Sequence, residues 1–209
     1  MDDVTLAKVL EADAACLWHD WAAALALAAA ACVTGEDLGA IRALPDERGR
    51  ANRIVLQRGH VVDIGDSSIA QMLRLGGAVA EEIGAVDRCK PGELDAVLAE
   101  GAVAGLFIVA TGTAAGLIDL PHWIWHCHHA SRPALVALHG AGSHRAALDA
   151  GADLVVLDAA SLGGPACGIV AGRDPLVAAC RLQAQGIGRA MLPRPHEREA
   201  LGLTLGGTS

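Results

Sequence analysis

The stretch from 153 to 172 reads DLVVLDAASLGGPACGIVAG: an apolar run, a short polar break, a Gly-Gly-Pro loop and a second apolar run. Loops between buried strands commonly carry functional side chains. The tip of this loop offers the carboxylate of Asp158 and the hydroxyl of Ser161. The sequence has only two lysines, Lys8 and Lys90, and both are far from the loop along the chain. The loop therefore carries no strongly reactive side chain.

Histidines form a second group of potentially reactive side chains. The segment PHWIWHCHHASRP, residues 121–133, holds His122 and His126 four positions apart, which places both on one face of a helix. Such a pair could share a metal ion, although zinc sites usually draw their ligands from separated elements. A surface helix whose last turn favours imidazolium is the simpler interpretation. We therefore predict no functional metal site and keep His122 and His126 as weak candidates.

The composition narrows the classes of function. A chain of 209 residues fits one large domain, and its net charge of −8 argues against nucleic acid or a membrane surface as a partner. Six cysteines are scattered without a CxxC pair, which predicts a reduced, cytoplasmic protein. The most apolar segment, residues 21–33, is too short to span a bilayer and predicts a buried helix.

Short apolar runs alternate with amphipathic stretches, which indicates an α/β fold with a mostly parallel sheet and helices on both faces. We expect a leading helix around Lys8 and a proline-interrupted tail at 196–209 that could hold one short helix, with residues 1–195 forming a single unit. The expected strands are 53–57, 78–84, 102–110, 134–139, 153–158 and 168–172. The other expected helices are 21–33, 66–75, 92–99, 119–130, 143–151 and 173–186.

Three motifs carry a resemblance to a known family: the tetrapeptide QRGH at 57–60, the strand GADLVV at 151–156 and the loop GGPACG at 163–168. In this order and spacing, the chain resembles the bacterial selenocysteine synthase (L-seryl-tRNA selenium transferase) family from about residue 10 to about residue 195. That family belongs to the fold type I, aspartate aminotransferase-like, pyridoxal-phosphate enzymes. The resemblance implies that the chain corresponds to the large domain alone, with the small domain of the family absent.

The resemblance also implies where the cofactor contacts should lie. The Schiff-base lysine of the family maps onto Ala160, and the aspartate that faces the pyridine nitrogen maps onto Ala137. The phosphate-binding turn before the Ala-rich helix maps onto Trp18, His19, Asp20 and Trp21. Asp20 is placed to cap this helix, so its carboxylate would take the N–H groups that a phosphate needs and would repel the phosphate as well.

Three altered contacts predict a pseudoenzyme that binds no cofactor itself. Enzymes of this fold form dimers with active sites at the interface, which implies a partner: a homologous lysine-bearing subunit, with pyridoxal phosphate in that subunit, or a second copy of this chain. His60, which in the resemblance faces the cofactor ring, would contribute to the partner site. So would the loop residues Ser161, Gly163, Gly164 and Pro165.

Two alternatives stay open from the sequence. The chain could be an active pyridoxal-phosphate-dependent lyase or transferase that holds the cofactor without a Schiff base. Alternatively, His60, His139 and Asp158 could perform other acid–base chemistry in a vacated pocket. We expect that pocket to be formed by Trp18, His19, Asp20, His139 and Asp158.

Overall fold

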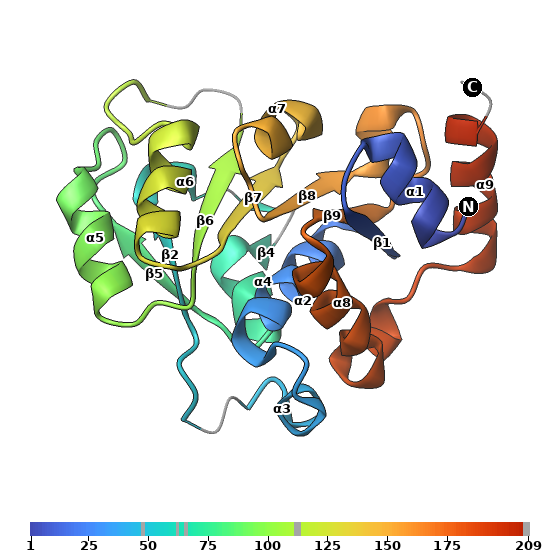
Figure 1. Cartoon of the computed structure of the whole chain (residues 1–209), viewed down its shortest axis with the longest axis horizontal. Coiled ribbons are helices and arrows are strands. Elements are labelled where there is room, and N and C mark those ends of the chain that lie inside the picture. The colour runs from blue at the N-terminus through green and yellow to red at the C-terminus, as the bar shows by residue number, and fades with distance from the viewer. Residues whose placement is uncertain (47–48, 62, 65–66, 111–113, 207–209) are drawn as a thin grey trace.

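A computed structural model describes residues 1–46, 49–61, 63–64, 67–110 and 114–206. One seven-stranded sheet lies between two layers of helices (Figure 1). The strand order is β1-β9-β8-β7-β6-β2-β5. Its strands are β1 (Ala14–Trp18), β2 (Arg53–Gln57), β5 (Val79–Ile83), β6 (Ala104–Val109), β7 (Ala134–Leu138), β8 (Leu154–Asp158) and β9 (Gly168–Gly172).

The sheet is mostly parallel, as the sequence predicts. Strands β5, β2, β6, β7 and β8 pair in parallel, whereas β9 runs antiparallel to both of its neighbours, β8 and β1. All five residues of β1, β7 and β9 are buried. A strand buried on both faces is a continuous apolar run, which is why β7 and β9 could be recognised in the sequence.

One face of the sheet is covered by α2 (Trp21–Thr34), α4 (Ile69–Leu75) and α8 (Asp174–Leu182). Twelve of the fourteen residues of α2 are buried, because the helix lies between the sheet and the two neighbouring helices. Alanines keep these contacts close and favour the helical conformation. The short helix α3 (Leu38–Ala43) packs against α2 beyond the sheet.

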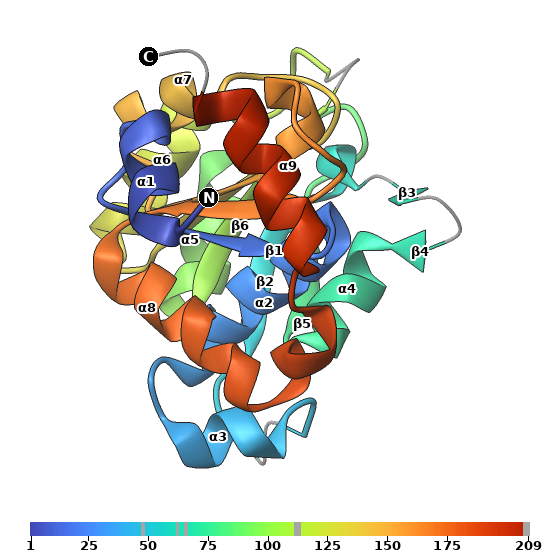
Figure 2. The ribbon, with the colours of Figure 1, turned by 90° about the vertical axis from the view of Figure 1, so that its right-hand side faces the viewer.

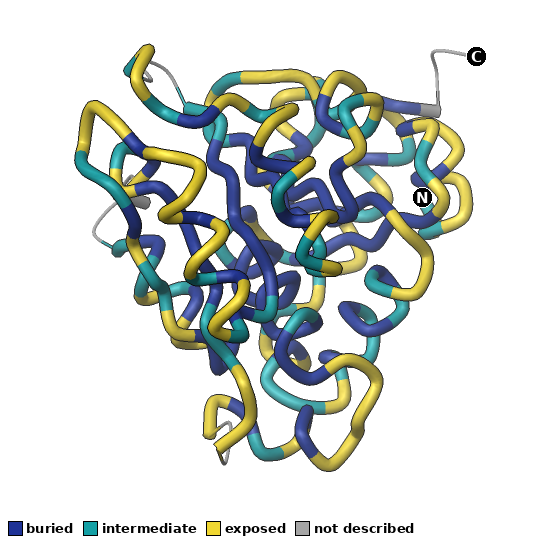
Figure 3. The backbone as a smooth tube through the Cα atoms, turned by 60° about the vertical axis from the view of Figure 1, so that its left-hand side comes forward, coloured by how far each residue is buried: buried dark blue, intermediate teal, exposed yellow. Residues whose placement is uncertain are grey.

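Five helices supply side chains to the core on the opposite face (Figure 3 colours their inward sides as buried). They are α1 (Asp3–Leu10), α5 (Pro91–Ala99), α6 (Leu120–His129), α7 (His144–Asp149) and α9 (Pro195–Gly206). Both lysines lie on this side of the sheet: Lys8 is exposed on α1, and Lys90 is exposed just before α5.

The segment from residue 196 differs from the predicted tail. Leu201 and Leu205, which are four positions apart on one face of α9, are buried in the core. The ammonium group of Met1 donates to the carbonyl of Arg198 at 2.7 Å, so the two ends of the described chain lie together. Figure 2 shows α9 crossing the β1 side of the molecule. Residues 195–206 therefore belong to the packed unit, while residues 207–209 lie outside the described residues.

Three strands and one helix among the described residues have no counterpart among the predicted elements. Strand β1 has five residues and lies shortly before α2, and α3 has six residues. Both are too short for a repeating hydrophobic pattern to stand out in the sequence. A two-residue pair, β3 (Asp63–Ile64) and β4 (Ser67–Ser68), precedes α4. In the described parts of the chain, no helix combines the length and the apolar character that crossing a membrane requires.

The contact between β9 and α2 generates a test of the packing. A Cβ atom at Gly168 would lie 2.0 Å from the carbonyl oxygen of Asp20, which is backbone and has no room to move. We expect Gly168→Ala to lower the free energy of unfolding by about 3 kcal/mol, because overpacking of this kind displaces the backbone. Urea denaturation followed by circular dichroism measures the change.

Gly92→Ala is the matched control. A Cβ atom at Gly92, in the first turn of α5, meets nothing within 4 Å. The control should therefore keep or raise the stability by up to about 1 kcal/mol. An unfolding midpoint of Gly168→Ala equal to that of the wild type would contradict the close packing of α2 on β9.

Candidate functional site

The ends of β7 and β8 and the start of α2 meet at the carboxyl edge of the sheet. Asp158, the last residue of β8, pairs with Gly168 of β9, and Gly168 in turn contacts the carbonyl of Asp20. The ring centroid of Trp21, in the first turn of α2, lies 4.9 Å from that of His139, which follows β7. Three of the expected pocket residues, Asp20, His139 and Asp158, are thereby gathered at one edge.

A cavity of about 340 Å³ opens at this edge. It is lined by Leu138, Gly140, Ala141, Gly142, Asp158, Ala160 and Ser161. Ala160 is exposed on the short 3₁₀ helix η2 (Ala159–Leu162). The position onto which the lysine maps is thus open to the cavity, but it carries a methyl group.

The polar groups of the cavity are engaged in local structure. The Asp158 carboxylate accepts a hydrogen bond from the Ala160 N–H at 2.9 Å, and the Ser161 hydroxyl donates to the Asp158 carbonyl at 2.6 Å. These bonds hold η2 at the end of β8, since a carboxylate or carbonyl beside a helical turn satisfies N–H and O–H groups that would otherwise lack partners. In this arrangement the side chains stabilise the loop.

The start of α2 is occupied by the protein itself. The Asp20 carboxylate accepts from the Ala23 N–H at 2.6 Å, so the predicted N-cap is confirmed. Nδ1 of His19 lies 3.1 Å from Oε1 of Glu197 on α9. Because helix N-termini bind phosphate through free N–H groups, a carboxylate in that place opposes phosphate binding by occupancy and by charge.

Trp18 and Ala137 lie deeper than the sequence suggested. Trp18 is 2% exposed within β1 and belongs to the core on the α2 side of the sheet. Ala137 is fully buried inside β7, facing the same side. Because alternate strand residues share a face, the next residue on that side is His139, whose ring reaches Trp21. The side chain from the β7 segment at the pocket edge is therefore that of His139, one of the expected pocket residues.

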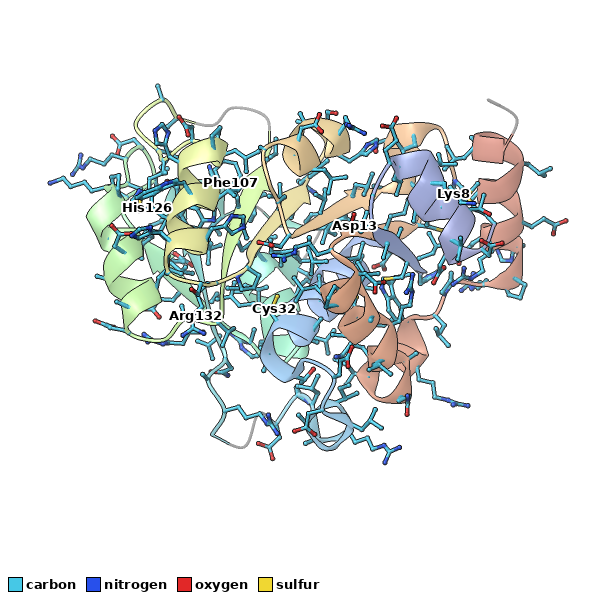
Figure 4. All side chains as sticks on the ribbon, viewed as in Figure 1. Lys8, Asp13, Cys32, Phe107, His126 and Arg132 are labelled. Carbon is cyan, nitrogen blue, oxygen red and sulfur yellow. The ribbon has the colours of Figure 1, made fainter. Side chains whose placement is uncertain are left out.

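His60 does not join the other pocket residues. It lies in η1 (Arg58–His60) and packs edge-on against Phe107, with ring centroids 4.4 Å apart. Phe107 points away from α2 into the core beneath α6 (Figure 4), so His60 lies on the opposite side of the sheet from Trp21 and His139. The grouping of His60 with His139 and Asp158 for acid–base chemistry is therefore not assembled in this structure.

The Gly-Gly-Pro loop is supported from behind by α9. Gly163 has a φ of 81°, a left-handed conformation that favours glycine. A Cβ atom at Gly164 would lie 2.8 Å from Cδ1 of the buried Leu201. Pro165 is half-buried, while Ser161 and Ala166 are exposed. The support from α9 could not be foreseen, because Leu201 is more than thirty positions away in the sequence.

The histidines of α6 pair with carboxylates. Nδ1 of His122 lies 2.7 Å from Oδ1 of Asp119, and Nδ1 of His126 lies 2.6 Å from Oδ1 of Asp95 on α5. Among the described residues, no cluster of three or more His, Cys, Asp or Glu side chains has metal-binding geometry. The pairing explains both histidines as surface contacts.

The burial of His60 generates a pH-dependent prediction. Its ring is 2% exposed, both ring nitrogens are buried without hydrogen-bond partners among the described residues, and burial lowers the pKa of His60 to about 4. In the unfolded chain the pKa is about 6.5. As the pH falls, the unfolded state therefore takes up this proton before the folded state does. The contribution of neutral His60 to the free energy of unfolding is present in full above pH 7 and is lost between about pH 6.5 and pH 4.

We expect the His60 contribution to remove about 2 kcal/mol of stability between pH 7.5 and pH 5. In His60→Leu that part of the loss should disappear, whereas His196→Leu, which replaces an exposed histidine of α9, should keep the wild-type difference. Urea denaturation at the two pH values measures it. Equal pH dependence in the wild type and His60→Leu would show that His60 is not buried as a neutral ring.

Comparison with known proteins finds two curated relatives of this chain. No protein-family model matches the chain. It is 35% identical over 189 residues to the 5'-C-glycyluridine monooxygenase-decarboxylase of a Streptomyces species, covering 89% of this chain and 47% of that protein. It is 30% identical over 171 residues to the D-glucosaminate-6-phosphate ammonia lyase of Salmonella typhimurium, covering 81% and 46% respectively. The chain thus spans about half the length of these curated relatives.

Solved structures share the fold. The structure of a D-glucosaminate-6-phosphate ammonia-lyase matches with a TM-score of 0.93 and 26% identity, over 98% of this chain and 56% of that one. A pyridoxal-5'-phosphate-dependent protein from Escherichia coli matches with a TM-score of 0.65 and 15% identity, over 97% of this chain and 51% of that one, which shows the fold alone. Its sheet order, its sequence relatives and its structural neighbours show that the chain has the fold of the fold type I pyridoxal-phosphate-dependent enzymes.

Proposed function

We propose that this chain is a non-catalytic subunit on a fold type I scaffold, and that it pairs with a homologous, lysine-bearing subunit whose active site it completes. The observation that carries the proposal is Ala160, which faces the cavity at the end of β8 where the family chemistry requires an amine. Neither lysine of the chain lines this cavity: Lys8 is exposed on α1, and Lys90 is exposed just before α5.

The residues around the cavity do not fit pyridoxal phosphate as a covalently bound cofactor. The Asp20 carboxylate accepts from the Ala23 N–H at the start of α2, and the ring of Trp21 contacts that of His139 after β7, with centroids 4.9 Å apart. A dianionic phosphate placed there would meet a carboxylate at a short distance, without a lysine nearby to offset the repulsion. We infer that the cofactor of the complex is held by the partner.

The Gly-Gly-Pro loop supports the pairing part of the proposal. Leu201 of α9 packs behind Gly164, while Ser161 and Ala166 face outward. A rigid loop with an exposed outer edge loses little conformational entropy on binding, which favours its use at an interface. A second copy of this chain would offer no lysine at the same place, so a lysine-bearing partner is the better fit.

An active lyase or transferase is the alternative function. The curated relatives are named as an ammonia lyase and a monooxygenase-decarboxylase, and in this alternative the chain holds the cofactor without a Schiff base to its own lysines. The assignment to the selenocysteine synthase subfamily and a cytoplasmic location, suggested by six free cysteines, stay predictions.

Reduction with borohydride tests the proposal, because it fixes a Schiff base to the lysine that forms it. The tagged chain is purified from its native source, reduced, digested and analysed by mass spectrometry. We expect the phosphopyridoxyl label on a lysine of a co-purifying homologue, with none on Lys8 or Lys90. A chain that purifies alone, or that carries the label itself and turns over an amino acid substrate, would overturn the proposal.

The role of the loop is tested with two matched substitutions. Ala166→Arg introduces a long charged side chain on the exposed edge of the loop, whereas Ala51→Arg does the same at an exposed position before β2. We expect Ala166→Arg to weaken association with the homologue at least tenfold, and Ala51→Arg to leave it unchanged, at equal thermal stability. Equal affinity of both variants in analytical ultracentrifugation would remove the loop from the interface.

A further inference from the structure

The amino edge of the sheet, opposite the cavity described above, carries a buried carboxylate. Asp153, directly before β8, is 2% exposed. Its Oδ2 accepts from the Ala134 N–H at 2.7 Å and lies 2.7 Å from Nε2 of His128, and its Oδ1 accepts from Nη1 of Arg173 at 2.8 Å. Both carboxylate oxygens are therefore engaged, which explains how the charge is tolerated in the interior.

Arg132 lies beside this group without an acceptor of its own. It follows α6 and leads through Pro133 into β7, and Figure 4 shows it below α6, at the edge from which β6 and β7 start. Its Nε is buried and has no hydrogen-bond partner among the described residues. A guanidinium stays protonated in proteins, and a buried donor without an acceptor is costly. Because Asp153 is already engaged by other donors, Nε of Arg132 remains a donor that a ligand in the adjoining cavity could use.

A cavity of about 450 Å³, open to solvent, lies beside these groups. It is lined by His128, Ser131, Arg132, Pro133, Asp153, Arg173, Pro175 and Leu176. Helix α8 starts at its wall, and the N-cap residue Arg173 makes no side-chain capping bond, while Asp174 is the acidic residue of the first turn. The two arginines outnumber the one carboxylate, and the prolines and the leucine supply an apolar wall.

We propose that this cavity binds a small organic anion through its oxyanion group, a carboxylate or a phosphate. The planar guanidinium of Arg132 presents two parallel N–H donors, which suits a bidentate contact with either group. The Ser131 hydroxyl is a further donor on the rim, and the apolar wall accommodates the organic part. The site is independent of the carboxyl-edge cavity, because the two lie at opposite ends of the parallel strands.

Titration calorimetry on the full chain tests the site with two probes, inorganic phosphate and succinate, at constant ionic strength. We expect saturable binding of one stoichiometric anion, with the tighter probe identifying the preferred group. Arg132→Gln should weaken that binding at least tenfold. Because the Arg132 side chain makes no hydrogen bond within the described residues, the substitution should leave the thermal stability without ligand unchanged.

Arg88→Gln is the matched control, since it removes one positive charge from a side chain that is 75% exposed at another surface. It should bind the probe as the wild type does. The proposal is overturned if neither probe binds the wild type saturably, if Arg132→Gln binds with wild-type affinity, or if Arg88→Gln loses as much affinity as Arg132→Gln.

Discussion

The close contact between the first turn of α2 and β9 determines how the carboxyl edge of the sheet is built. Gly168 lets the carbonyl of Asp20 approach the strand, and α2 is then enclosed by the sheet, α4 and α8. A helix buried on nearly all sides must be apolar around its whole circumference, which accounts for its run of alanine and leucine. The fixed position of α2 sets where its N-terminus, Trp21 and His139 meet the end of β8.

The carboxyl edge is stabilised by local hydrogen bonds of the chain itself. The Asp20 carboxylate accepts from the Ala23 N–H at the start of α2, the Asp158 carboxylate accepts from the Ala160 N–H, and the Ser161 hydroxyl donates to the Asp158 carbonyl. Each bond adds to local stability by about 1 kcal/mol in typical cases. A donor that is engaged in this way is not available to a ligand at the same time.

The two edges of the sheet differ in their electrostatics. At the carboxyl edge the carboxylates of Asp20 and Asp158 accept backbone N–H groups, and the exposed Asp20 and half-buried Asp158 add negative charge there. At the amino edge both carboxylate oxygens of Asp153 are engaged by donors, whereas Nε of Arg132 has no hydrogen-bond partner among the described residues. The amino edge therefore has a hydrogen-bond donor without an acceptor, although the net charge of the whole protein is −8.

The sequence by itself determined the fold class, the central strands and the cap of α2, because buried parallel strands are continuous apolar runs and an N-cap is a local signal. Strands β2 and β9 begin and end where the sequence indicated. It also determined that Ala160 stands after β8, where a resemblance places a lysine. Only the tertiary structure decided that β1 pairs with β9, that α9 joins the core and that His60 lies on the far face from His139. Those contacts join residues that are distant in the chain. They depend on the face of the sheet to which each strand end directs its side chains, and a local sequence pattern does not indicate that face.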